Sequence, residues 1–265
     1  MRTGSLSGLI IGACNIPFAL KPTGRKELSM PQLVFLHGPG AGACADAYDF
    51  QTRHFPGSVA PNLPGHLYGT HCHSIERFTE WVRGWLWAQG MTKDLVLVGY
   101  TLGASIALQY ALDYPEEVKG IVIMTVSPRP KVRNPGTYEL RLAGIKDEKG
   151  FDAWMADRPK ALQFVEPGLR ARLLERHRQI GPQCQLDDLK AIDAFDVRER
   201  LATLKPKLLL LRGVDDPSHP PEYEKEIHEA VPGSRYVRLS GAGHFPATEK
   251  PDEVNRLIEE FMAGM

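Results

Sequence analysis

Short apolar runs alternate along this chain with longer segments of helical periodicity, and this alternation limits the folds open to it. Strand-like runs occupy residues 31–38, 58–66, 94–99, 120–125, 207–213 and 234–240. Continuously apolar runs of this length are typical of strands that are buried on both faces of a sheet. Their alternation with helices predicts an α/β fold, with a mostly parallel central sheet and helices on both of its faces.

The segments between these runs have the sequence signals of helices. The clearest helix is expected at 74–89, where Phe78 and Val82 are among the apolar residues at helical spacing. Ser74 is a favoured N-cap residue and Gly90 a favoured stop, so the sequence predicts both ends of this helix. Further helices are expected at residues 45–54, 101–115, 221–231 and 251–262.

Residues 128–204 differ from the rest of the chain because they are charged, helical in pattern and interrupted by prolines. We therefore expect residues 1–127 and 205–265 to form the core and residues 128–204 to form an inserted helical cap. Open α/β sheets bind ligands at the carboxyl ends of their strands, so the cap is expected there. Trp154 and Phe164 are candidates for lining an apolar substrate pocket, or they belong to the cap's own core.

Charge and length exclude several classes of function. The 32 basic and 32 acidic residues give a formal net charge of zero, which does not favour nucleic acid or an anionic membrane as partner. No apolar run reaches the roughly 20 residues that span a bilayer. Residues 71–73 (His-Cys-His) have no second ligand group at a useful spacing, so we expect no metal site. No cofactor is expected either.

The first residues and the cysteines bear on localisation. Arg2 and the apolar stretch 6–14 imitate a short signal peptide, but Ser7 and Gly8 interrupt that stretch. A β-hairpin that opens the domain explains the same residues. The four cysteines are scattered and form no CxxC pair, which fits reduced thiols. We therefore expect a cytoplasmic protein.

The segment that most strongly indicates chemistry is GYTLG (residues 99–103), between a predicted strand and an apolar helix. It resembles the nucleophile elbow G-x-S-x-G of the α/β-hydrolases, with Thr101 in the serine position. In such an elbow the glycines are needed because the turn is too sharp for side chains. The helix that follows supplies N–H groups and a positive dipole for a developing oxyanion.

Two later motifs match the same family in its chain order of nucleophile, acid and histidine. GVDD (residues 213–216) resembles the acid turn, and the resemblance selects Asp216 over Asp215. GHFP (residues 243–246) resembles the loop of the catalytic histidine, His244. Taken singly, Asp216 suits a turn and His244 a loop. Together they imply an α/β-hydrolase fold in which His244 is general base and Asp216 orients it.

A fourth motif, HGPG (residues 37–40), resembles the family's oxyanion loop. Pro39 has no N–H, so the donor is expected from Gly40 or another nearby amide, paired with the N–H of Leu102. His37 is expected to be structural. The turn PNLPGH (residues 61–66) resembles another family turn and is interpreted as architectural.

The resemblance predicts a hydrolase that cleaves a small carboxylic ester or lactone through Thr101, His244 and Asp216. Threonine keeps a hydroxyl but adds a methyl, which is unfavourable at the positive φ of an elbow. Two alternatives stay open. In one, His244 activates water, for ester or C–C bond hydrolysis, and Thr101 only positions the substrate; in the other, the protein is a non-catalytic ligand-binding relative. The sequence does not indicate the natural substrate or the oligomeric state.

Overall fold

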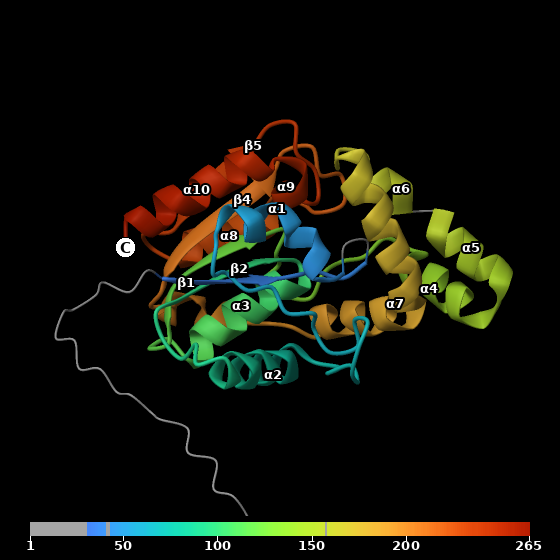
Figure 1. The fold of residues 1–265 in the computed structure, drawn as a ribbon. Helices are drawn as coiled ribbons and strands as arrows, with labels where there is room; N and C mark the ends of the chain where they lie inside the picture. Colours follow the sequence, from blue (N-terminus) through green and yellow to red (C-terminus); the bar gives the residue numbers. More distant parts are fainter. Residues whose placement is uncertain (1–30, 41–42, 157) are drawn as a thin grey trace, which may run out of the picture.

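The computed structural model describes residues 31–40, 43–156 and 158–265, and a single parallel sheet lies at its centre (Figure 1). Its strands, in spatial order, are β1 (Gln32–Leu36), β2 (Leu95–Tyr100), β3 (Val118–Met124), β4 (Lys207–Gly213) and β5 (Arg235–Leu239). Every neighbouring pair is parallel. The predicted fold class is therefore confirmed.

One strand prediction differs from the structure and another is not tested by it. The run at 58–66 contributes only an isolated bridge between Val59 and Val34, because it leaves the sheet at the prolines that follow. The predicted opening hairpin lies outside the described residues.

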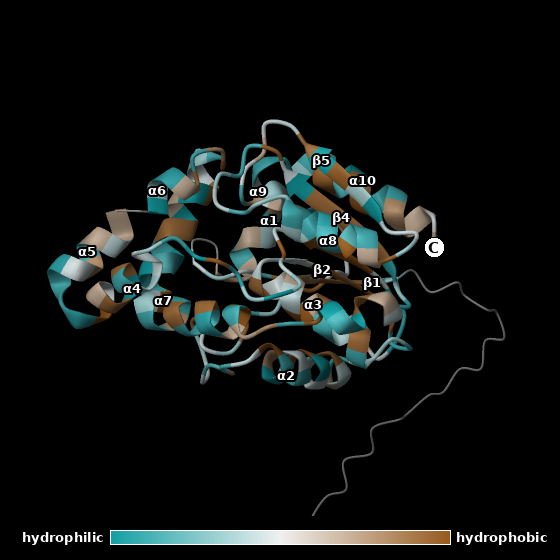
Figure 2. Ribbon diagram, turned by 180° about the vertical axis from the view of Figure 1, so that it is seen from behind, coloured by the Kyte–Doolittle hydropathy of each residue, from teal (hydrophilic) through white to brown (hydrophobic). Residues whose placement is uncertain are grey.

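Successive residues of each strand point to opposite faces, and each face has its own apolar core. Leu97, Ile121 and Leu210 belong to one core, whereas Val98 and Val122 belong to the other. The first face is covered by α2 (Ile75–Ala88), α3 (Leu102–Asp113) and α8 (Glu222–Ala230). The second is covered by η1 (Ala45–Tyr48), α1 (Asp49–His54), α9 (Pro246–Glu249) and α10 (Pro251–Ala263). In Figure 2 the central strands are mostly brown, whereas the helices that cover them mix brown with teal.

Local signals set the boundaries of these helices. The hydroxyl of Ser74 accepts a hydrogen bond from the backbone N–H of Arg77, as expected for the N-cap of α2. Gly90 follows the helix with a φ of 75°, a conformation that glycine adopts at little cost. The sequence therefore predicted both ends of α2 correctly.

Between β3 and β4 the described chain contains helices and no strand. It forms α4 (Thr137–Lys146), α5 (Glu148–Ala156), α6 (Arg158–Ala161), α7 (Pro167–Asp193) and η2 (Arg198–Thr203). Helix α7 is kinked at Gly181, which precedes Pro182. Figure 1 shows α4, α5 and α6 grouped at one end of the sheet, with part of α7 beside them. None of the helices described is both long and apolar enough to cross a membrane.

Candidate active site

Thr101 occupies a sharp turn between β2 and α3, with φ 46° and ψ −107°. A Cβ on Gly99 would lie 2.4 Å from the backbone of Gly103, and a Cβ on Gly103 would lie 1.9 Å from the carbonyl oxygen of Leu36. Both flanking glycines are therefore required by close backbone approach. A β-branched residue at this positive φ costs about 1–3 kcal/mol, so the surrounding structure must hold Thr101 in place.

The backbone of Thr101 is anchored on both sides. Its N–H donates to the carbonyl of Met124 (3.1 Å), and its carbonyl accepts from the N–H of Ser105 (2.9 Å). The side chain of Ser105 donates to the same carbonyl (3.2 Å). Thr101 is only 5% exposed, and its Oγ1 has no hydrogen-bond partner within the described part of the chain. A buried hydroxyl without a partner is uncommon in a structural role.

His244 and Asp216 form a directly bonded pair. Nδ1 of His244 lies 2.7 Å from Oδ2 of Asp216. Because an ionised carboxylate only accepts, Nδ1 is the nitrogen that donates to Asp216. Ser218 donates its N–H (2.8 Å) and hydroxyl (2.7 Å) to Oδ1 of Asp216. Burial acts to raise the pKa of Asp216, but His244 and Ser218 outweigh it and hold that pKa well below its usual value.

The neighbouring carboxylate, Asp215, makes structural hydrogen bonds instead. Oδ2 of Asp215 accepts from the N–H of Gly241 (2.9 Å), and the backbone N–H of Asp215 donates to the carbonyl of Ala242 (2.9 Å). Asp215 therefore ties β4 to the loop after β5. The structure brings Asp216, rather than Asp215, to His244.

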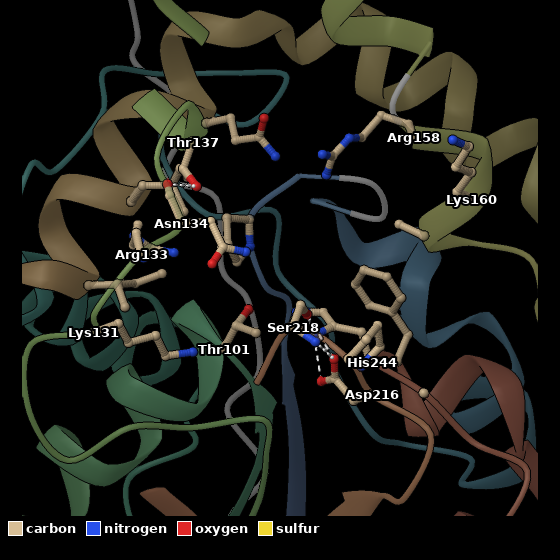
Figure 3. Close-up of a pocket in the computed structure, with 18 of the residues that line it drawn as sticks. Thr101, Lys131, Arg133, Asn134, Thr137, Arg158, Lys160, Asp216, Ser218 and His244 are labelled. Atoms are coloured by element: carbon tan, nitrogen blue, oxygen red, sulfur yellow. Dashed lines mark hydrogen bonds and ion pairs between the residues drawn. The ribbon is translucent and has the colours of Figure 1, made fainter. Parts of the chain in front are cut away.

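Thr101, Asp216 and His244 line one cavity of about 690 Å³, at the carboxyl ends of the strands. Figure 3 shows Thr101 on one side of this cavity and Asp216, Ser218 and His244 together on the other. Thr101 Oγ1 makes no hydrogen bond to His244. Residues of segment 128–204 supply most of the lining, and we call them the helical wall.

The loop that resembles the oxyanion motif approaches Thr101 closely. A Cβ on Gly38 would lie 2.1 Å from Thr101 Oγ1. Pro39 lines the cavity, whereas Gly40, at φ 82°, faces the side-chain amide of Gln185. Leu102 is the first residue of α3, so its N–H belongs to the helix terminus beside Thr101. Residues 41–42, which follow this loop, lie outside the described residues.

His37 and the turn at 61–66 make structural contacts. Nδ1 of His37 lies 3.1 Å from the carbonyl of Gly38, and Nε2 accepts from the N–H of Leu63 (2.9 Å). Burial lowers the pKa of His37 to about 3, so it is neutral. The side chain of Asn62 accepts from the N–H of Ala45 (2.8 Å). These bonds join the two loops and leave His37 no free lone pair.

The two aromatic candidates for the pocket lie in different places. Phe164 is 47% exposed and lines the cavity close to Gly243. Trp154 is fully buried among the helices of segment 128–204 and is not part of the cavity wall. Its indole N–H donates to Gln185 (2.6 Å), and its ring lies 3.9 Å from the ring of His177. A buried indole needs a partner for its N–H, and Gln185 supplies it inside the helical group.

Sequence reasoning did not predict the contact of Ser218 with Asp216 or the cationic side chains of the helical wall. The cations that line the cavity are Lys131, Arg133, Arg141, Arg158 and Lys160. The run RPKVR (residues 129–133) was a visible signal, since it follows a predicted strand directly. The net charge of zero did not indicate this cationic cluster, because net charge does not describe how charges are distributed over a protein.

Two groups of side chains among the described residues could hold a metal ion. One is His66, Cys184 and Asp188, and the other is His71, His73 and Asp187. The sequence offered no second ligand group near residues 71–73, but α7 brings three such residues beside them. Asp188 accepts from Nε2 of His66 (2.9 Å) and of His71 (2.8 Å). These bonds join the loop before α2 to α7.

The buried ring of His66 lies between two acceptors, because its Nδ1 is 3.3 Å from the carbonyl of Leu63. Burial acts to lower the pKa of His66, but the Asp188 carboxylate outweighs it and raises that pKa above its usual value. A protonated His66 paired with Asp188 explains both contacts.

Known proteins resemble this chain in sequence and in structure. A sequence model of the alpha/beta hydrolase family matches residues 33–257. The "Putative carbamate hydrolase RutD" of Klebsiella pneumoniae is 31% identical over 192 residues, covering 68% of this chain and 70% of the relative. The pimeloyl-(acyl-carrier protein) methyl ester esterase of Aromatoleum aromaticum is 27% identical over 258 residues, covering 89% of this chain and 100% of the relative. The enol-lactonase structure from Burkholderia xenovorans matches with a TM-score of 0.75 at 19% identity, over 91% of this chain and 94% of that chain.

Proposed function

Because the chain belongs to the alpha/beta hydrolase family, we propose that it hydrolyses a small carboxylic ester or lactone with Thr101, His244 and Asp216. The main support is one observation: a threonine held in a strained turn shares a cavity with a bonded His–Asp pair. Strain of this kind persists only where the surrounding structure enforces it, and it clusters at active sites. The relatives named as an esterase and a carbamate hydrolase, and the structural neighbour named as an enol-lactonase, fit the same reaction class.

In the proposed reaction, Thr101 Oγ1 attacks the acyl carbon while Nε2 of His244 takes the hydroxyl proton. Asp216 stabilises the imidazolium and keeps its Nδ1–H oriented. The N–H of Leu102, with Gly40 or another amide of loop 37–40, stabilises the oxyanion. His244 then gives its proton to the departing alkoxide, which leaves an acyl-enzyme. His244 then deprotonates a water molecule, which attacks the acyl carbon, and the resulting imidazolium returns that proton to Thr101 Oγ1 as the acid product leaves.

A second candidate mechanism has a specific observation in its favour. Thr101 Oγ1 makes no hydrogen bond to His244. If that separation persists with substrate bound, His244 would activate a water molecule and Thr101 would only position the substrate. The same arrangement suits hydrolysis of a C–C bond. A non-catalytic binding role is less well supported, since it does not explain the hydrogen-bonded pair of His244 and Asp216.

Hydrolysis of a panel of esters and lactones by three proteins separates these mechanisms. Direct attack requires the oxygen of residue 101, so Thr101→Ala should lose at least a thousandfold in kcat/KM, while Thr101→Ser retains activity. Water activation predicts appreciable turnover by Thr101→Ala. A binding protein would hydrolyse no panel member, although ligands would still raise its melting temperature.

Two further parts of the proposal concern the rest of the chain. We propose that residues 128–204 act as a cap that sets substrate preference, since they supply most of the residues that line the cavity. We also propose a cytoplasmic enzyme. Cys44, Cys72 and Cys184 are free thiols, as a reducing compartment requires.

A further inference from the structure

Charge is distributed unequally between the two walls of the cavity. All five cationic side chains of the lining come from residues 131–160, whereas its carboxylates come from residues 215–249. Each of those carboxylates is engaged with the loop after β5. Asp215 accepts from Gly241, Asp216 holds His244, and Glu249 accepts from the N–H of Gly243 (2.5 Å). The three carboxylates of the lining are therefore bound to the loop after β5.

Lys131 is held without a carboxylate partner. Its Nζ lies 2.7 Å from Nδ1 of His219. Nε2 of His219 lies 3.0 Å from the carbonyl of Val126 and 3.1 Å from a carboxylate oxygen of Glu224, so it is the protonated nitrogen. Nδ1 is thus a neutral acceptor for the ammonium group. Among the residues that the structure describes, no carboxylate lies within ion-pair distance of Lys131.

Arg133 has unused hydrogen-bonding capacity at the same wall. Its Nε donates to Asp193 (2.5 Å), which fixes the guanidinium. Its Nη2 is buried and has no hydrogen-bond partner in the described ranges. An unsatisfied buried donor is costly, and a carboxylate is the acceptor that best fits the planar fork of arginine. Figure 3 shows Lys131 and Arg133 on the same side of the cavity as Thr101.

We propose that Lys131 and Arg133 form an anion subsite and that the substrate is an ester or lactone bearing a carboxylate. The inference rests on the proposed hydrolase function and deepens it by naming the substrate class. The anion would accept a hydrogen bond from Arg133 Nη2 and pair directly with the ammonium group of Lys131, which no described carboxylate contacts. A cavity of about 690 Å³ has room for such a small molecule.

Matched esters test the subsite. Monomethyl adipate and methyl hexanoate have the same ester and chain length and differ only in a terminal carboxylate or methyl group. We expect the wild-type kcat/KM to favour monomethyl adipate by about tenfold to a hundredfold, as charge-assisted hydrogen bonds allow. The corresponding ω-amino ester should be the poorest of the three.

Variants assign this preference to the subsite. Lys131→Met should lower the ratio of kcat/KM for monomethyl adipate over methyl hexanoate about tenfold. Arg133→Lys, which keeps the charge but removes the fork, should lower it less. Lys205→Met is the matched control, since this exposed lysine precedes β4, at the end of the sheet away from the cavity. It should leave the ratio unchanged.

The pH dependence provides a second signature. Burial, with a smaller effect of Arg133, lowers the pKa of Lys131 to about 7. Only protonated Lys131 binds a carboxylate well, so KM for monomethyl adipate should rise as pH increases through 7. Glu224, Asp216, Asp193 and His219 also face this lysine, and burial raises the pKa of Glu224 to about 7. The rise in KM must therefore vanish in Lys131→Met to be assigned to Lys131.

The outcomes distinguish the two levels of the proposal. Equal activity on both esters, or a preference that Lys131→Met leaves intact, would overturn the anion subsite while the hydrolase function stands. If no ester is hydrolysed, the proposed function fails, and adipate binding then tests the subsite alone. Adipate should raise the melting temperature of the wild type more than that of Lys131→Met; equal shifts would contradict the subsite.

Discussion

Two groups of residues line the cavity. Thr101, Asp216 and His244, which we call the strand-end wall, each follow a strand and are placed by the turn in which they lie. The helical wall comes from loop 131–136 and from helices that pack on one another. The first wall depends on backbone geometry within a few residues. The second depends on contacts such as Arg133–Asp193 and Trp154–Gln185, which join residues far apart in the chain. The difference suggests that chemistry resides in the strand-end wall and substrate choice in the helical wall.

The largest effect should come from the strand-end wall. His244→Ala removes the general base of every catalytic mechanism considered, so kcat/KM should fall at least about a thousandfold. Steady-state kinetics on the best ester, with circular dichroism as a check of folding, measures this. A folded His244→Ala variant with near wild-type turnover would show that this wall is not the site of catalysis.

Separate substitutions of Asp215 and Asp216 test which carboxylate acts on His244. Asp216→Asn loses the charge that orients His244 and should cost about a hundredfold to a thousandfold in kcat. Asp215→Asn alters only the contact with Gly241 and should cost a few-fold, by the modest worth of one exposed hydrogen bond. The comparison of the two kcat values uses the same assay. The reverse ranking would mean that the acid has been assigned to the wrong residue.

Within the helical wall, Trp154 should matter for stability. Trp154→Ala removes a fully buried ring and leaves Gln185 Oε1 without its indole donor, although Arg141 still donates to it. The free energy of unfolding should fall by about 3 kcal/mol. Urea denaturation measures this fall. A loss below about 1 kcal/mol would argue that the indole is not a core element of this helical group.

Phe164, in contrast, should affect selectivity with little cost in stability. Its ring is half exposed and lines the cavity, so Phe164→Ala should change the free energy of unfolding by less than about 1 kcal/mol. Relative kcat/KM values across acyl chain lengths should shift about threefold to tenfold. Phe164→Leu, which keeps apolar volume, is the matched control and should shift them less. An unchanged ranking in Phe164→Ala would remove this residue from the pocket.

The sequence predicted the sheet and most helices because each depends on local signals, whereas Asp216 and His244 were assigned through the family resemblance. Alternating apolar runs, the glycines around Thr101 and the Ser74 cap are all readable over a few residues. Sequence reasoning failed where distant segments meet. The bond between His66 and Asp188 spans 122 positions, and the cations of the cavity come together from loop 131–136, α4 and α6. Val59 shows the same limit, since the neighbouring prolines reduced an expected strand to one bridge.

The central claim is that Thr101 attacks the substrate, and mass spectrometry after treatment with a phosphonylating inhibitor tests it most directly. The account predicts one adduct, located on the peptide that contains Thr101 and retained in Thr101→Ser. It also predicts no adduct in Thr101→Ala or His244→Ala, because attack needs both the hydroxyl and the base. Efficient ester hydrolysis by the wild type with no adduct at residue 101, together with an active Thr101→Ala variant, would contradict it.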